Sequence, residues 1–287
     1  MNVREYIEAR AATDAAFKRL LDAIKALEER MAERAAEAIA GLDTSGGRIL
    51  GTASNVAAAL DVVREMQAEL GADPWMDAVA DYLESIDATT DRVFRYAATL
   101  GTVDQAASIA LRRQYKALLA DMLTSVGTYA ADLWVPVYQS VASAIASEST
   151  TAQAIEAIDV LALGGEDQAQ GSVARIVAQP VSDATAIHER ATTQEVARQL
   201  NIKFYRYQGS EIDTTRPFCA ERRGKVWHEA EIRAWAREDW AGKRPETTAG
   251  NIFDLLGGYN CRHILVPLAK RDVPASDLER MRKKGLL

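Results

Sequence analysis

The stretch IKFYRYQG, residues 202–209, marks the point where the character of the chain changes. Its residues alternate, with Ile202 and Phe204 on one side and Lys203 and Tyr205 on the other, and a glycine closes it. This period of two and the aromatic content predict a β-strand. No comparable alternation occurs before residue 180, so we expect the strands to lie in the C-terminal part of the chain.

Upstream of this stretch the sequence predicts helices. Apolar residues recur at steps of three and four, which lines one face of a helix. Two such helices are indicated by Phe17, Leu20, Leu21, Ile24, Leu27 and Met31 and by Val56, Leu60, Val63 and Leu70. A further helix is predicted to follow a cap at residues 149–151 and to end at Leu163. No histidine precedes His188, which excludes a metal–carboxylate bundle built on Glu-x-x-His pairs.

Downstream, the pattern mixes strands and helices. GKVWHEAEI, residues 224–232, predicts a short strand or turn that leads into a helix, and CRHILVPL, residues 261–268, predicts a β-branched strand stopped by Pro267. The tail predicts a capped helix from Ser276, because acidic residues come first and basic residues last, as the helix dipole prefers.

These elements predict a mainly α fold in four parts. We expect a helical bundle over residues 1–163, a linker over 164–180, a small α+β domain with a short antiparallel sheet over 181–270, and a helical tail over 271–287. The length of 287 residues is consistent with about two domains.

The composition of the chain disfavours several classes of protein. Residues 1–180 carry 15 Lys and Arg against 26 Asp and Glu, whereas residues 181–287 carry 19 against 15. The positive and negative residues are interspersed, which favours an ordinary solvated surface over a dedicated nucleic-acid site.

No apolar run is long enough to span a membrane, and the first ten residues lack the apolar core of a secretory signal. Two cysteines do not make a disulfide framework, so we expect a protein made in a reducing compartment.

Both cysteines and His263 fall in two short blocks, PFCAERRGKVW and GGYNCRHILVP, and His228 directly follows the first block. One interpretation is a zinc site drawn from Cys219, His228, Cys261 and His263, although the spacing lacks the close C-x2-C pairs of most structural zinc sites. Another is a disulfide between the two cysteines, which requires their Cα atoms to lie within about 7 Å.

Two further interpretations remain open for the same blocks. A nucleolytic site would use His263 and Asp213 as acid and base and Arg216 as the cation, and a Cys–His nucleophile pair is a variant of that idea. The structural interpretation makes the cysteines small core hydrophobes. It expects Asp213 to cap a turn, Arg216 or Arg262 to pair with a carboxylate, and Asn260 to occupy a turn.

Taken together, the two blocks resemble the C-terminal domain of the phage Mu F-like minor head proteins, the phage head morphogenesis family. The shared pattern is Asp-x-x-Arg-x-x-Cys with a following Gly, and later Asn-Cys-Arg before a short strand and a Pro. It falls here on Asp213, Arg216, Cys219, Gly224, Asn260, Cys261, Arg262 and Pro267. The resemblance covers residues 181–270, and family members often carry cysteine where this chain has His263.

The resemblance implies a structural component of a tailed-phage virion, assembled in the cytoplasm of the bacterial host. Such proteins enter the head in low copy number, associate with the portal protein and other head proteins, and act in head assembly or genome ejection. We therefore expect no catalytic residues and no cofactor. The acidic helical part is expected to contact the portal or another copy of the chain, and the basic C-terminal part to lie near packaged DNA.

Two alternatives keep the same small domain but change its task. One is a phage-delivered, nuclease-like effector, and the other is a zinc-stabilised binding module. We also expect Cys219 and Cys261 to lie close together, because the disulfide and the shared-site interpretations both require it.

Overall fold

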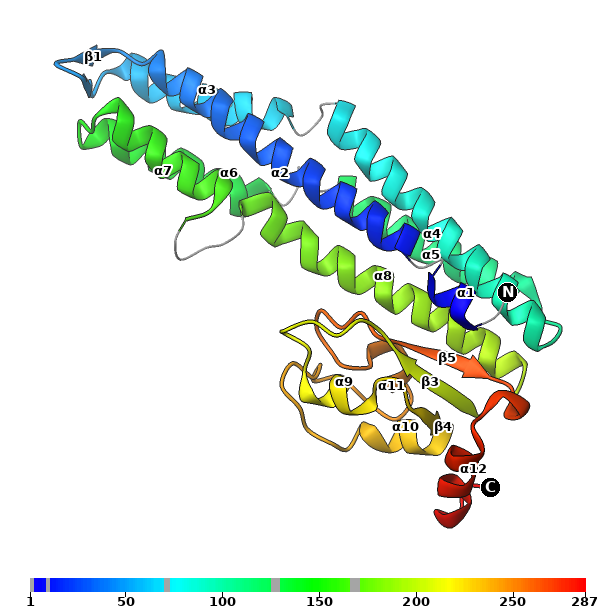
Figure 1. The fold of residues 1–287 in the computed structure, drawn as a ribbon. Coiled ribbons are helices and arrows are strands. Elements are labelled where there is room, and N and C mark those ends of the chain that lie inside the picture. The colour runs from blue at the N-terminus through cyan, green and yellow to red at the C-terminus, as the bar shows by residue number, and fades with distance from the viewer. Residues whose placement is uncertain (1–2, 9–10, 70–72, 125–129, 166–170) are drawn as a thin grey trace. The chain divides into compact units, whose positions relative to one another are not determined.

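The computed structural model describes residues 3–8, 11–69, 73–124, 130–165 and 171–287, and Figure 1 shows their ribbon. The fold is mainly α with small antiparallel sheets, as predicted. The elements before residue 200 are α1 (Val3–Glu8), α2 (Ala11–Ala40), β1 (Thr44–Ser45), β2 (Arg48–Ile49), α3 (Ala53–Glu69), α4 (Asp73–Leu100), α5 (Gln105–Thr124), α6 (Ala130–Ala146), α7 (Thr151–Leu163) and α8 (Ser172–Gln199).

The remaining elements alternate strands with short helices. They are β3 (Phe204–Gln208), α9 (Pro217–Arg222), β4 (Val226–His228), α10 (Glu229–Trp235), α11 (Ile252–Leu255), β5 (Ile264–Leu268), the 3-10 helix η2 (Lys270–Asp272) and α12 (Ala275–Lys283). Among the described residues, no helix combines the length and the apolar character needed to cross a bilayer.

The chain packs into two compact units. The sheet unit contains residues 1–14, 84–118 and 181–287, and the helical unit contains residues 15–83 and 119–180. The boundary passes within α2, α4, α5 and α8, so the long helices contribute residues to both units. Each unit is described separately below.

This division corrects the predicted domains 1–163, 164–180, 181–270 and 271–287. Part of the predicted bundle belongs to the sheet unit, and so does the predicted tail. The predicted linker is also wrong in its last part, because Ser172 already begins α8 and the helix continues through Pro180; residues 166–170 lie outside the described residues. Buried valines on both sides, Val177 and Val181, hold this helix in place despite the missing proline N–H.

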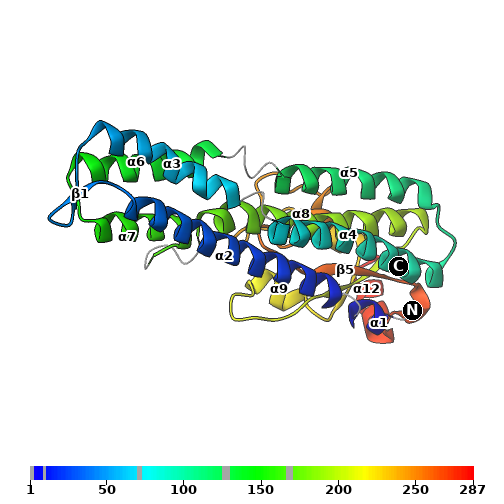
Figure 2. The same cartoon turned by 90° about the horizontal axis from the view of Figure 1, so that it is seen from above.

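In the helical unit, α6 packs between α3 and α7 (Figure 2). The stripe predicted for α3 is wrong by one residue: Val56 and Leu60 are 51% and 50% exposed, whereas Asn55 and Ala59 are buried. Leu70 of that stripe lies outside the described residues. The Asn55 side chain explains the shift, because it accepts from the Asp43 amide and donates to the carbonyls of Asp43 and Leu50.

Two local features flank these helices. The predicted cap of α7 is confirmed: Thr150 accepts from the Gln153 amide at 3.2 Å in a capping box. The break predicted at residues 44–47 contains a small hairpin, β1 and β2, which the sequence did not reveal as strands. Its turn uses Gly46 and Gly47, both at positive φ, where other residues are strained.

The sheet unit is built on a three-stranded antiparallel sheet in the order β4-β3-β5. Phe204 and Tyr205 lie in different clusters, as the predicted alternation requires, but the strand begins only at Phe204, and Ile202 packs with the cluster of Tyr205 rather than with Phe204. Tyr205, Tyr207 and Leu265 point into one cluster with residues of α9, α10 and α11. Ile264 and Val266 point into another with residues of α1, α4 and α8. The sheet therefore has helices on both faces (Figure 1).

The C-terminal predictions need two corrections. Pro267 does not stop β5: it pairs with Tyr205 inside the ladder, and the strand continues to Leu268. Helix α12 begins at Ala275 after Pro274, without a side-chain cap, rather than at Ser276. Its Met281 is buried in a cluster with β-strand residues, so α12 is part of the unit rather than a separate tail.

Candidate functional site

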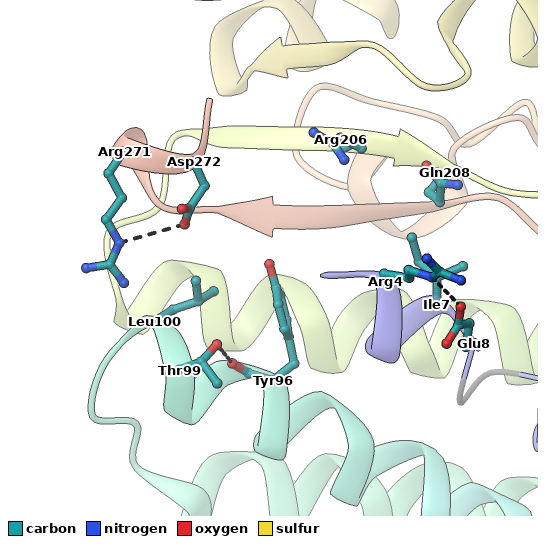
Figure 3. A pocket seen from close by; sticks show the side chains of 10 residues that line it. All are labelled: Arg4, Ile7, Glu8, Tyr96, Thr99, Leu100, Arg206, Gln208, Arg271 and Asp272. Carbon is teal, nitrogen blue, oxygen red and sulfur yellow. Dashed lines mark hydrogen bonds and ion pairs between the residues drawn. The ribbon is translucent and has the colours of Figure 1, made fainter. Parts of the chain in front are cut away.

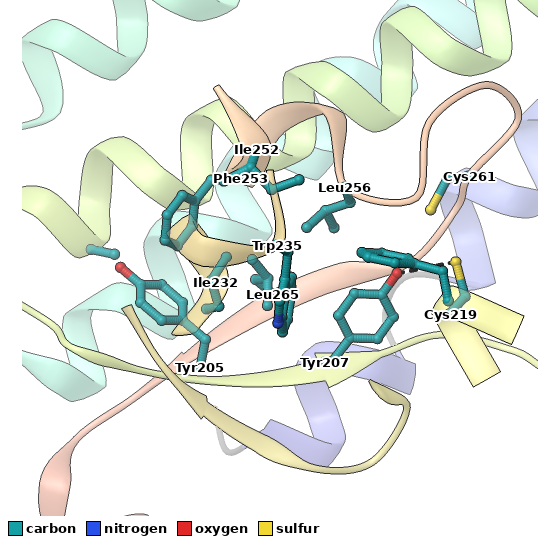
Figure 4. Close-up of a cluster of buried hydrophobic side chains, with 12 residues drawn as sticks. Tyr205, Tyr207, Cys219, Ile232, Trp235, Ile252, Phe253, Leu256, Cys261 and Leu265 are labelled. Carbon is teal, nitrogen blue, oxygen red and sulfur yellow. Dashed lines mark hydrogen bonds between the residues drawn. The ribbon is translucent and has the colours of Figure 1, made fainter. Parts of the chain in front are cut away.

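The first cysteine is placed by α9. Pro217 starts this helix at a position where a missing N–H costs nothing. The first turn then buries Phe218 and Cys219. The hydroxyl of Tyr207, on β3, donates to Cys219 Sγ at 3.2 Å. Figure 4 shows this contact at the edge of the apolar cluster that α9, α10 and α11 form on the sheet.

The second cysteine and His263 sit on the approach to β5. Asn260 adopts a positive φ of 56°, which confirms the turn predicted there. Cys261 and His263, which are two residues apart in the chain, are both buried. The Sγ atom of Cys261 lies 3.9 Å from Nδ1 of His263. The ligand atoms of Cys219, Cys261 and His263 all lie within 4.8 Å of one another, and all three residues are buried. We call these three residues the Cys–Cys–His cluster.

Close backbone approach makes this cluster possible. A Cβ atom at Gly257 would lie 2.5 Å from Cys219 Sγ and 2.8 Å from Cys261 Sγ, and one at Gly209 would collide with the His263 ring. Only glycine fits at both positions, because real Cβ contacts are longer. Gly257 of LLGGYN and Gly209 of IKFYRYQG therefore leave the space that the cluster needs.

Helix α8 holds the segment that carries two of the three residues. Arg190 is buried, and its guanidinium donates to the carbonyls of His263 at 2.8 Å, of Asp254 at 2.9 Å and of Cys261. Two helical turns earlier, Asp183 accepts from the Asn260 amide at 2.8 Å. An irregular buried segment needs such partners, because its backbone groups have no ladder to join.

The two thiols are electrostatically coupled. The hydrogen bond to Cys261 and burial raise the pKa of Cys219, which keeps its proton. The hydrogen bond from Cys219 lowers the pKa of Cys261, and the charge of Arg190 and the contact with His263 lower it further, against the opposing effect of burial. Cys261 is therefore the more readily ionised of the two thiols and the better metal ligand.

Of the predicted residues, the structure brings Cys219, Cys261 and His263 together, and Arg216 reaches the turn beside them. Arg216 Nη2 donates to the Tyr259 carbonyl at 2.7 Å and so joins the two sequence blocks, although by a carbonyl rather than the predicted carboxylate. Gly224, at φ 77°, turns the chain between α9 and β4. The carbonyl of Pro267 accepts from the Tyr96 hydroxyl at 2.6 Å.

Three predicted residues lie apart from the cluster. Asp213 is exposed, and its turn is closed instead by Thr215, whose Oγ1 accepts from the Ile212 amide. Arg262 is exposed. His228 caps α10, where its Nδ1 accepts from the Ala230 amide. The predicted metal candidates therefore reduce to three, and the nucleolytic set of Asp213, Arg216 and His263 is not gathered at one exposed point.

Sequence reasoning missed the α8 residues. His188, Glu189 and Arg190 are consecutive, ionisable and all buried. Glu189 pairs with Arg92 at 2.8 Å and accepts from the Tyr6 hydroxyl at 3.2 Å. Three neighbours on a helix point about 100° apart, so burial of all three requires packing around most of the helix. The run HER within an otherwise amphipathic helix was the signal available in the sequence.

A cavity of about 690 Å³ lies in the sheet unit, on the sheet face opposite the Cys–Cys–His cluster (Figure 3). Its charged lining includes Arg4, Arg206 and Arg271 together with Glu8 and Asp272. Two of these arginines are paired there, Arg4 with Glu8 at 2.6 Å and Arg271 with Asp272 at 3.9 Å.

Comparison of the chain with protein-family models, with curated protein sequences and with solved structures finds no match.

Proposed function

We propose that the chain is a minor head protein of a tailed phage, bound to the portal protein in the head and acting in head assembly or genome ejection. One observation carries the proposal: the two blocks of the resemblance, far apart in sequence, meet at one buried cluster. Cys219 from the first block and Cys261 from the second lie within 4.8 Å, and Arg216 binds the turn before Cys261. A pattern that resembles a family in two blocks is more informative when those blocks form a single structural unit.

A second feature supports a protein partner. Residues 1–180 carry an excess of 11 negative charges, which disfavours packaged DNA as their neighbour. In the helical unit, large apolar side chains are exposed on three helices, namely Val56 and Leu60 on α3, Val135 and Tyr138 on α6, and Val160 and Leu163 on α7. Exposed apolar groups on a charged surface favour protein contacts, here with the portal protein or another copy of the chain. The mildly basic C-terminal part tolerates packaged DNA nearby.

The proposal is tested with the full chain and the portal protein encoded in the same genome. We expect the two to co-elute in size-exclusion chromatography and the chain to be found in purified particles in low copy number. The double substitution Val56→Asp, Leu60→Asp should weaken co-elution. Ile212→Asp is the matched control, because Ile212 is 64% exposed but lies in the sheet unit. A chain that elutes alone and is missing from particles contradicts the proposal.

A cleavage assay separates this role from a nuclease-like effector. Purified chain is incubated with RNA and with DNA, beside the variants Arg216→Ala and His263→Ala. We expect no cleavage from any of the three. Cleavage by the wild type that either substitution abolishes would favour the effector instead.

A further inference from the structure

We propose that Cys219, Cys261 and His263 bind a zinc ion that ties α9 to the approach of β5. The donor set is two sulfurs and one imidazole, all buried, and these are ligand types that zinc prefers. The inference concerns the stability of the sheet unit, and it does not depend on the proposed role in the virion.

The geometry fits a tetrahedral ion. Zn–S bonds of about 2.3 Å and a Zn–N bond of about 2.0 Å place the ligand atoms roughly 3.5–3.8 Å apart. Cys261 Sγ and His263 Nδ1 are 3.9 Å apart, and all three ligand atoms lie within 4.8 Å. Small side-chain adjustments would bring the three ligand atoms to bonding distance, and a water molecule would take the fourth position.

Without a metal ion, the buried imidazole ring of His263 lacks the hydrogen bonds that such a ring normally makes. A buried imidazole normally makes hydrogen bonds through its ring nitrogens. In the described residues, His263 Nδ1 has only the long contact to Cys261 Sγ, and Nε2 has no hydrogen-bond partner. A purely hydrophobic site would not explain why a histidine occupies this buried position between two thiols, whereas a metal bond would.

The surroundings fix the ligands as a metal site requires. The Tyr207 hydroxyl donates to Cys219 Sγ, and its ring stacks on the His263 ring with centroids 5.2 Å apart. Arg190 holds the carbonyls of Cys261 and His263. Outer contacts of this kind orient first ligands and tune their affinity. Two thiolates also balance the charge of a divalent ion, so the zinc-bound set of two sulfurs and one neutral imidazole carries no net charge.

A zinc ion at this site would cross-link two segments of the sheet unit. Cys219 lies in α9, and the other two ligands precede β5, so a bound ion joins segments that are distant in sequence and irregular near Gly257. Such a bond adds binding energy directly to folding, because the unfolded chain has no preformed site.

The test uses the full chain, purified under reducing conditions with a tag that does not bind metals. Elemental analysis is expected to find about one zinc per chain after zinc addition and dialysis. Cys219→Ser, Cys261→Ser and His263→Asn should each lose it, whereas the control His228→Asn, outside the cluster, should retain it. A wild type without stoichiometric zinc overturns the proposal, and so does zinc retained by both Cys→Ser variants.

A measurement on the wild type alone covers the case in which the variants fail to fold. The apo protein is titrated with Co²⁺ and followed by visible absorption, and its thermal midpoint is compared with and without zinc. We expect charge-transfer bands from thiolate–cobalt bonds and a midpoint that rises with zinc and falls again with chelator. The absence of thiolate bands together with an unchanged midpoint rejects the site.

Discussion

Helix α8 buries charge in two different ways on its two sides within the sheet unit. Toward α4 and α1, Glu189 meets an opposite charge, Arg92, and the pair is completed by the hydroxyls of Tyr6 and Thr13. Toward the sheet, the charge of Arg190 meets backbone carbonyls. The first arrangement fixes two helices to each other, whereas the second fixes a loop that has no regular structure of its own. The difference predicts where a substitution is most damaging.

The largest effect is expected for Arg190→Met. The substitution leaves three buried carbonyls without their donor, and hydrogen bonds from charged groups are among the stronger ones, so the free energy of unfolding should fall by at least about 4 kcal/mol. Urea denaturation measures it. Arg198→Met is the matched control on the same helix, because Arg198 is 71% exposed and should change stability by less than about 0.5 kcal/mol. Equal effects of the two would show that the carbonyl contacts contribute little.

The ion pair between Glu189 and Arg92 should behave differently, because a double substitution can remove both charges at once. Glu189→Leu or Arg92→Met alone leaves a buried charge unpaired and should cost about 3 kcal/mol. The double variant removes both charges and should cost less than the sum of the two, with a coupling of about 1–3 kcal/mol. Additive losses in this double-mutant cycle would mean that the pair is not coupled.

His188 adds a pH dependence on the α4 side of the helix. Burial lowers its pKa from 6.5 to about 4. Thr90 donates to the Ile86 carbonyl, which leaves its oxygen to accept from His188 Nε2–H. The unfolded chain protonates near pH 6.5, so the stability contributed by neutral His188 is complete above that pH. It declines as the pH falls and is lost near pH 4, a change of about 3 kcal/mol.

The measurement is urea denaturation at several pH values between 7 and 4, for the wild type and for His188→Gln. The glutamine keeps a donor for Thr90 but does not titrate. We expect the stability difference between the two proteins to shift in favour of the variant as the pH falls. Parallel curves would contradict the assignment.

A smaller effect is expected where the backbone approaches the thiols. Gly257→Ala places a Cβ atom 2.5 Å from Cys219 Sγ, and overpacking of this kind should cost about 2 kcal/mol. At Gly250 an added Cβ meets only Thr248 Oγ1, at 3.6 Å, so Gly250→Ala should be nearly neutral. A neutral Gly257→Ala, measured by thermal unfolding against this control, would show that the cluster can move apart.

Local patterns predicted local structure well. The strand at residues 202–209, the cap at Thr150 and the mainly α fold follow from period, capping chemistry and propensity, which act between near neighbours. The closeness of Cys219 and Cys261 was also predicted, from the zinc and disulfide interpretations and from the resemblance of the two blocks. It is confirmed by the ligand distances.

The predictions that the structure corrects depend on contacts between segments that are distant in the sequence. Asn55 and Ala59 are buried in place of Val56 and Leu60, because Asn55 binds the hairpin backbone. The domain boundary was placed at glycines near residue 164, whereas the packing boundary falls within helices. Arg190 was overlooked because its partners are carbonyls, which leave no trace in the side-chain sequence. The proposed function and the metal site remain predictions for the experiments above.

Pro267 has a consequence for association between chains. β5 is an edge strand of the sheet, and an edge normally offers unpaired N–H and carbonyl groups to a strand from another molecule. At Pro267 there is no N–H to offer, and the carbonyl is taken by the Tyr96 hydroxyl from α4. This side of the sheet is therefore protected against strand addition at that position, so a high local concentration of the protein need not lead to edge-to-edge aggregation through β5.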